Sequence, residues 1–201
     1  SFSKSGWISC QSGEVFTHRN RLRAITRLLK GIAHTMKIFG SCLCGAVQFQ
    51  VTCTIDTIYH CHCGLCRKQT GSGFNAASLV EQSHFSWLQG DQQIRQYQKA
   101  SGFRSAFCRV CGSCVPNQVN QTSWMWIPLG LLDSEITPIQ RLNFCVNSKA
   151  AWVESPSADK HYSELPSSTE LKAYFKLDWF ASGNAWGNSE KCAYSSCWLC
   201  P

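Results

Sequence analysis

Seven of the fourteen cysteines in this chain lie in three close clusters whose spacings suit metal binding. The spacings are C-x-C, C-x-C-x-x-C and C-x-x-C, formed by Cys42 and Cys44, by Cys61, Cys63 and Cys66, and by Cys108 and Cys111. A structural zinc takes four tetrahedral ligands, whereas a catalytic zinc keeps one position open. The two pairs therefore predict a closed site with four cysteine ligands. The group of three predicts a second zinc with an open position, where chemistry can occur.

Disulfides of a secreted protein are the alternative use of so many cysteines. The spacing favours metal, because cysteines two positions apart rarely reach disulfide geometry with each other and Cys-x-x-Cys is a common zinc knuckle. Thiolate ligands also favour zinc over harder metals. We therefore expect two zinc ions, reduced thiols and, with them, a cytoplasmic location.

Glycines flank the proposed four-cysteine site, with Gly40 and Gly45 around the first pair and Gly112 after the last cysteine. Two cysteines on one face of an extended strand lie about 7 Å apart, too far for one zinc, so the backbone must bend there. Glycine permits such a bend. Cys114 remains the alternative that would replace one of the four ligands.

The fourth ligand of the second zinc stays open at this stage. A closed structural site would recruit a further side chain from among His60, His62, His84 and Cys114. His60 and His62 alternate with the cysteines, so along a strand they would face the opposite side, which favours core or supporting roles. Arg67 and Lys68 follow the cluster directly and are candidates to bind an anionic substrate, with compensation of the thiolate charge as the alternative.

The charge distribution argues against a nucleic-acid partner for the cysteine-bearing part. The chain carries a formal +7, of which residues 1–35 contribute +5, from six basic residues and one acidic residue. Residues 36–175 hold eleven basic and nine acidic side chains, so this part is nearly neutral. No apolar run approaches the ~18 residues of a spanning helix, and the start lacks the pattern of a secretory signal. We therefore expect a soluble protein with no membrane partner.

Residues 1–35 are predicted to be a basic extension. Apolar residues recur at helical spacing within RNRLRAITRLLKGIAHT, which indicates a short amphipathic helix. A transit peptide, a membrane-surface helix and a nucleic-acid-binding arm are all compatible with it, and so is upstream sequence with no function of its own.

Residues 36–175 are predicted to form one mainly β domain. Val47, Phe49 and Val51 alternate with polar residues, as in a half-buried strand. Further short strands are expected within 55–63, 72–80, 85–90, 94–98, 103–115, 123–132 and 141–147, with a short helix after Cys66. Residues 154–175 are expected to follow the surface and to end in a helical turn or two. Residues 176–201 form a Trp- and Cys-containing tail of open role, in which another metal could use Cys192, Cys197 and Cys200.

Three ordered segments carry a resemblance to a known family. GSCLCGAVQFQV, HCHCGLCRKQTGSGFNA and FRSAFCRVCGS, in this order, resemble the glutathione-dependent formaldehyde-activating enzymes, whose domain is shared with a centromere protein. The resemblance covers about residues 36–155. It implies a tent-like, multi-sheet β fold with two zinc ions, in which Cys42, Cys44, Cys108 and Cys111 hold the structural ion and Cys61, Cys63 and Cys66 the catalytic one. The departures are the two chain ends and Cys114, and none of them removes a ligand.

The resemblance also implies an activity, the condensation of glutathione with formaldehyde to S-hydroxymethylglutathione by a carbon–sulfur lyase. A free thiol near pKa ~8.5 is mostly protonated at neutral pH, and metal binding favours its nucleophilic thiolate. Ser72 and Asn75 are candidates to hydrogen-bond the aldehyde oxygen, with a turn as the alternative. A non-catalytic zinc-stabilised binding module, or the same fold acting on another thiol or electrophile, are the competing hypotheses.

Overall fold

In this computed structural model the fold is described for residues 36–120 and 122–177. They form three β-sheets and two short α-helices, which confirms the predicted mainly β class. The predictions for residues 1–35 and for Cys192, Cys197 and Cys200 lie outside the described residues. Among the described helices, none has the length and apolar character needed to cross a membrane.

The three sheets differ in size. The first has the order β1-β2-β5, with β1 at Ile38–Ser41, β2 at Gln48–Val51 and β5 at Phe85–Gln89. The second has the order β11-β10-β3-β4-β9-β8, whose strands in that order are Lys160–His161, Gln140–Phe144, Thr57–Cys61, Asn75–Glu81, Trp124–Pro128 and Asn117–Gln118. The third pairs β6 (Ile94–Gln98) with β7 (Arg104–Cys108). Four 3₁₀ turns complete the elements: Gln82–His84, Asp91–Gln93, Leu129–Leu131 and Val146–Ser148.

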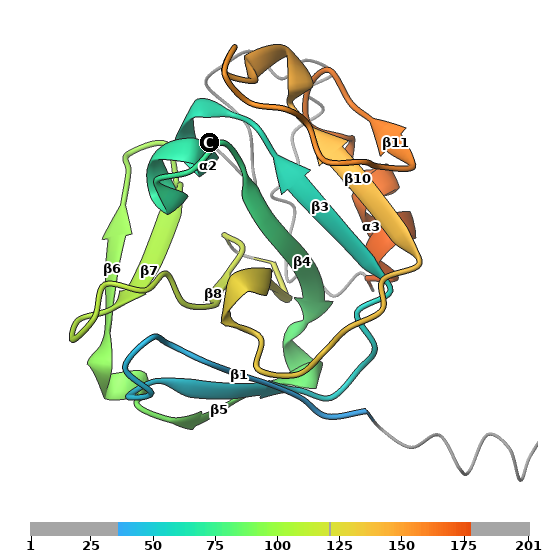
Figure 1. The fold of residues 1–201 in the computed structure, drawn as a ribbon. Helices are drawn as coiled ribbons and strands as arrows, with labels where there is room; N and C mark the ends of the chain where they lie inside the picture. The colour runs from blue at the N-terminus through green and yellow to red at the C-terminus, as the bar shows by residue number, and fades with distance from the viewer. Residues whose placement is uncertain (1–35, 121, 178–201) are drawn as a thin grey trace, which may run out of the picture. The chain divides into compact units, whose positions relative to one another are not determined.

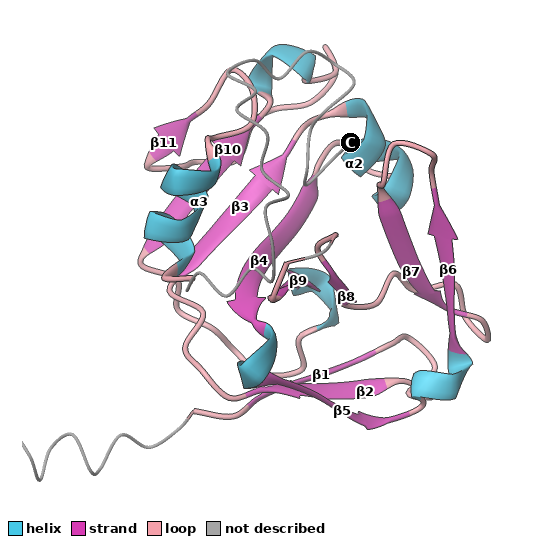
Figure 2. Ribbon diagram, turned by 180° about the vertical axis from the view of Figure 1, so that it is seen from behind, coloured by secondary structure: helices cyan, strands magenta, loops and turns pink. Residues whose placement is uncertain are grey.

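The sheets stand around a shared interior. Figure 2 shows the six-stranded sheet and the β6–β7 pair on two sides, the β1-β2-β5 sheet along a third, and α2 (Gly64–Thr70) between β4 and β7 at the opposite end. Val47, Phe49 and Val51 are fully buried, so the alternation in this segment points its apolar residues inward as predicted. The six-stranded sheet and the β6–β7 pair therefore both reach the end where α2 lies, whereas the β1-β2-β5 sheet lies away from it (Figure 1).

Strand register fixes the position of the central cysteine. β3 pairs in parallel with β10, which places Cys61 beside Phe144, and antiparallel with β4, which places Cys61 opposite Asn75. Cys61 is thus the last residue of an interior strand, and it is fully buried. The chain then turns directly into α2.

The helix α2 begins earlier than predicted. The Cys63 sulfur accepts a hydrogen bond from the Cys66 backbone N–H and caps the helix, so the helix starts at Gly64 rather than after Cys66. It ends at Gly71, whose φ of 65° lies in the left-handed region that favours glycine. The helix therefore contains one of the cysteines instead of following all three.

The segment expected to follow the surface contributes more than was predicted. β11 adds to the edge of the six-stranded sheet beside β10. α3 (Ser168–Phe175) starts with a capping box formed by Ser167 and Glu170, and Leu171 and Leu177 are buried against the core. The predicted helical turns are present, but burial of Leu171 makes the segment part of the packed fold, and Leu177 extends this packing into the predicted tail.

Candidate metal centres

Two tight turns bring the first four cysteines together. The turn after β1 is closed by hydrogen bonds from Cys42 N to Val47 O and from Gly45 N to Cys42 O, at 3.0 and 2.8 Å. The knuckle after β7 is closed by a bond from Gly112 N to Cys108 O at 2.8 Å. Gly45 and Gly112 have φ values of 72° and 77°, so glycine supplies the backbone bend at both turns.

The geometry of this group fits a tetrahedral metal. The sulfurs of Cys42, Cys44, Cys108 and Cys111 all lie within 4.8 Å of one another. Cys42 and Cys44 are 3.6 Å apart at sulfur, and Cys44 and Cys108 are 3.9 Å apart. Four thiolates about 2.3 Å from one zinc would be about 3.8 Å from one another, whereas a disulfide requires about 2.0 Å. The four thiols therefore match a metal site and not a pair of disulfides.

Ser113 connects the two halves of this group. Its hydroxyl accepts a hydrogen bond from Leu43 N at 3.1 Å and lies 3.3 Å from the Cys111 sulfur. Hydrogen bonds from the Ser113 hydroxyl and backbone N–H to the Cys111 thiolate lower the pKa of this thiol to about 5. A lowered pKa favours the deprotonated form that a metal requires.

Replacement of Ser113 with alanine is therefore expected to weaken metal binding. Without the hydroxyl the pKa of Cys111 rises, so protons compete with the metal at higher pH, and the affinity falls about tenfold. Metal release measured with a chromophoric chelator, as a function of pH, checks this. Ser86→Ala on exposed β5 is the control, and an identical release curve for S113A and wild type would contradict the role of Ser113.

The cluster of three forms a second, separate group. The sulfurs of Cys61, Cys63 and Cys66 lie within 4.8 Å of one another. Cys61 and Cys66 are buried, and Cys63 is partly exposed. The Asn75 side-chain N–H groups point to the Cys66 sulfur at 4.0 Å and to the Gln69 Oε1 at 3.2 Å. Three thiols at these separations fit three positions of a tetrahedral ion, and a partly exposed edge leaves room for a fourth ligand.

The other candidates for a fourth ligand lie outside this group. Neither His60, His62, His84 nor Cys114 belongs to either set of close thiols among residues 36–177. The rings of His60 and His62 pack against Phe74, with centroids 4.9 and 5.5 Å away, and burial lowers the pKa of both. Cys114 instead directs its thiol to the Gln69 carbonyl at 3.4 Å. Both histidines are therefore neutral supporting residues beside the cluster.

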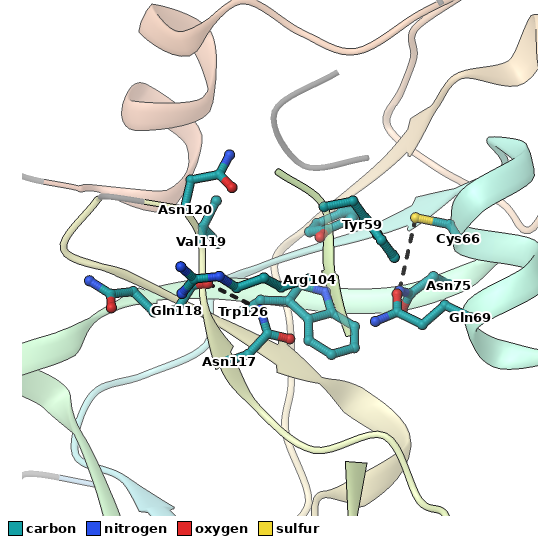
Figure 3. A pocket seen from close by; sticks show the side chains of 11 residues that line it. Tyr59, Cys66, Gln69, Asn75, Arg104, Asn117, Gln118, Val119, Asn120 and Trp126 are labelled. Atoms are coloured by element: carbon teal, nitrogen blue, oxygen red, sulfur yellow. Dashed lines mark hydrogen bonds between the residues drawn. The ribbon is translucent and has the colours of Figure 1, made fainter. Parts of the chain in front are cut away.

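A small pocket lies directly beside Cys66 (Figure 3). Its cavity volume of about 30 Å³ is room for about two water molecules or an end group of similar size. The walls come from β3, β4, β7, β8, β9 and α2, and their residues are Tyr59, Cys66, Gln69, Asn75, Phe103, Arg104, Asn117, Gln118, Val119, Asn120 and Trp126. The pocket thus joins one thiol of the cluster to polar groups on other strands.

The basic residue that lines this pocket is not one of the two that directly follow the three-cysteine group in the sequence. Arg67 and Lys68 are absent from its walls, and Lys68 is exposed on α2. Arg104 lines it instead, and this residue was missed. The alternation of the strand could have indicated that Arg104 faces inward, because it lies on the same face as Ala106 and Cys108, both of which are fully buried.

Ser72 and Asn75, the two candidates to bind the aldehyde oxygen, also differ in their position relative to the three-cysteine group. The Ser72 hydroxyl donates to the Phe74 carbonyl at 2.5 Å and contacts Thr70, so the turn after α2 accounts for it. Asn75 is buried at the cluster and lines the pocket. Of the two, Asn75 alone lies beside the thiols.

Comparison with known proteins agrees with this arrangement. The family model described as glutathione-dependent formaldehyde-activating enzyme matches residues 37–155. A Halomonas elongata protein whose name refers to the same family is 28% identical over 141 residues, covering 62% of this chain and 85% of that protein. A crystal structure of a Rhodobacter sphaeroides protein is 22% identical and covers 48% of this chain and 89% of its own, with a TM-score of 0.40. With both cysteine groups inside the matched segment, this chain belongs to the glutathione-dependent formaldehyde-activating enzyme family.

Proposed function

We propose that the chain binds two zinc ions with different roles. Cys42, Cys44, Cys108 and Cys111 would hold a structural ion, which their near-tetrahedral sulfur spacing supports. Cys61, Cys63 and Cys66 would hold a catalytic ion, since three thiols lie together and the other candidate ligands of the described chain lie outside the group. Zinc is the metal that a thiolate donor set favours.

We further propose that the second site condenses glutathione with formaldehyde to S-hydroxymethylglutathione, a carbon–sulfur lyase reaction. The thiol sulfur forms a bond to the formaldehyde carbon, the carbonyl π bond breaks, and the thiol proton ends on the new hydroxyl oxygen. Zinc bound at the three cysteines would supply an open position that favours the thiolate form of the substrate. Family membership and the pocket beside Cys66 support this assignment.

The residues around the cluster would prepare it for this reaction. Burial of Cys61 and Cys66 excludes water from their side of the site. The amide N–H of Asn75 points to the Cys66 sulfur and stabilises negative charge there. His60 and His62, neutral because burial lowers their pKa, add no positive charge that would quench a thiolate. Bringing thiol and aldehyde together adds the gain from proximity.

The three-thiol group with a pocket at its edge is the observation that carries the proposal. A purely structural module would need a closed second site. On this proposal, residues 36–177 hold the whole activity in a reducing, cytoplasmic setting, because Leu177 still packs in the core, and the basic residues 1–35 are dispensable for it.

The test is the rate of interconversion of glutathione and its hydroxymethyl adduct, measured by NMR exchange spectroscopy with formaldehyde present. The protein carrying two zinc ions is expected to accelerate exchange well above the spontaneous rate, and a chain beginning at Met36 should do so equally. An unchanged spontaneous rate with two zinc ions confirmed would reject glutathione and formaldehyde as substrates. It would leave the binding module or another thiol as the working hypothesis.

A further inference from the structure

Two buried polar atoms in the pocket beside Cys66 have no hydrogen-bond partner among residues 36–120 and 122–177. They are the Nε of Arg104 and the Oδ1 of Asn117. Asn117 donates from Nδ2 to the Gln118 carbonyl at 3.1 Å, which fixes its amide so that Oδ1 is the atom left over. Asn117 is 8% exposed, so bulk solvent does not satisfy this acceptor. Each such group costs free energy unless something in the pocket pairs with it.

Arg104 also has no charge partner within the part of the chain that the structure describes. The ion pairs within residues 36–177 join Lys160 to Glu170 and Lys176 to Asp56, and none involves Arg104. The pocket walls contain no carboxylate, so its guanidinium is their one formal charge. Arg104 is held on β7 opposite Gln98 of β6, so its backbone is fixed by strand pairing. A guanidinium carried by a paired strand, whose buried Nε–H has no hydrogen-bond partner and which has no counter-ion in the described chain, is a site for an anion, and carboxylate suits its geometry.

The two ends of the pocket differ in chemistry. Figure 3 shows Cys66, Asn75 and Gln69 at one end, and Arg104 reaching across Trp126 toward Gln118 at the other. A ligand with its sulfur at the three-cysteine group would therefore enter beside Cys66 and direct a polar end toward Arg104. The volume admits such an end group but not a whole tripeptide.

We propose that Arg104 and Asn117 form the subsite that binds a carboxylate, with its neighbouring N–H group, of the thiol substrate. The Arg104 Nε–H donates to the carboxylate, and the Asn117 Oδ1 accepts from the N–H. This proposal rests on the proposed function, and it selects peptide-like thiols over uncharged ones. Glutathione carries this pair of groups at both ends: the glycine carboxylate with its peptide N–H, and the γ-glutamyl carboxylate with its ammonium.

The test compares wild type with Arg104→Gln and Arg104→Lys, all zinc-loaded. Glutathione binding is measured by calorimetry, and KM and kcat by the exchange assay. R104Q is expected to weaken binding and to raise KM at least tenfold with kcat nearly unchanged, because the lost interaction lies away from the reacting sulfur. R104K should recover part of the affinity, since it keeps the charge but not the planar fork. Arg95→Gln, exposed on the neighbouring strand β6, is the matched control and should change neither.

A comparison of related thiols identifies which carboxylate of glutathione contacts Arg104. Glutathione esterified at glycine and γ-glutamylcysteine both lack the glycine carboxylate, whereas cysteinylglycine lacks the γ-glutamyl group. The thiol that lost the contacting carboxylate should bind wild type and R104Q equally. For thiols that keep it, the tenfold difference should persist.

Two outcomes would overturn the proposal. Equal glutathione affinity and KM in wild type and R104Q, with catalysis intact, would mean that buried waters alone satisfy Arg104 and Asn117, and the proposed function would stand. Wild type that neither binds glutathione nor accelerates the reaction would reject both. Binding that depends on Arg104 without acceleration would reject only the lyase activity.

Discussion

Replacing Cys108 with alanine is expected to abolish cooperative folding of the domain. Cys108 is fully buried in a small cluster with Val47, Ala106 and Val115, and its sulfur joins a turn 64 residues earlier in the chain. Structural zinc sites of this kind contribute about 10–16 kcal/mol of apparent binding free energy. That is comparable with the whole stability of a domain, about 5–15 kcal/mol. The substitution also leaves three thiolates where four are needed.

The measurement is urea unfolding followed by circular dichroism, with metal content determined on the same sample. Cys108→Ala should show no cooperative transition and about one zinc fewer per chain than wild type. Cys53→Ala is the matched control, because Cys53 lies outside both thiol groups and is half-buried. Its loss should cost about 1 kcal/mol and no metal. Treatment of wild type with a strong chelator should likewise abolish the cooperative transition, and a cooperative, fully stable C108A would refute a structural metal.

The sequence predicted the grouping of cysteines well because ligand spacing is a local property. A C-x-C turn and a C-x-x-C knuckle can form within a few residues, and glycines such as Gly45 and Gly112 mark the required bends. The long strands were predictable for a similar reason, since alternation is visible within a single segment. Each segment expected to hold a strand between Met36 and Asn147 contains an observed one, but the return strand expected after the Cys108–Cys111 knuckle is only an isolated bridge between Phe107 and Cys114.

What the sequence did not reveal depends on contacts between distant segments. Arg67 follows Cys66 in the chain, but the turn of α2 carries it away from the pocket walls, whereas Arg104 reaches them from another sheet. β11 has two residues and is defined by its pairing with β10, so it is too short to show an alternating pattern in the sequence. The start of α2 was missed because a thiol, Cys63, serves as its N-cap. Each of these requires knowledge of the tertiary neighbours.

Replacing Cys63 with serine is expected to remove the proposed lyase activity while the fold persists. Serine keeps an acceptor for the Cys66 backbone N–H, which the Cys63 sulfur now receives at 3.4 Å, so the start of α2 is preserved. It is a poor zinc ligand by comparison, so the second site loses one of its three thiolates. A catalytic metal contributes several kcal/mol of transition-state stabilisation, so the exchange rate should fall at least about hundredfold.

Two further variants separate the helix cap from the chemistry. Cys63→Ala removes both the acceptor that caps α2 and the thiolate ligand. It should therefore be as inactive as C63S, and its free energy of unfolding should in addition be about 1 kcal/mol lower. Cys114→Ser changes a thiol near the same helix that donates to the Gln69 carbonyl and lies outside both thiol groups, so near-wild-type activity is expected. The three variants are compared by exchange rate, zinc content and urea midpoint.

The pattern of results discriminates between the possible ligand sets. Loss of activity in C63S with a normal urea midpoint and one zinc retained would assign catalysis to the three-cysteine group and structure to the four-cysteine group. If C114S loses the second zinc as well, Cys114 closes that site as a fourth ligand, and a structural role for both ions follows. Full activity in C63S would mean that two thiols suffice or that the reaction occurs elsewhere. Because the serine variant preserves the helix cap, an inactive but stable C63S can be attributed to the missing thiolate itself.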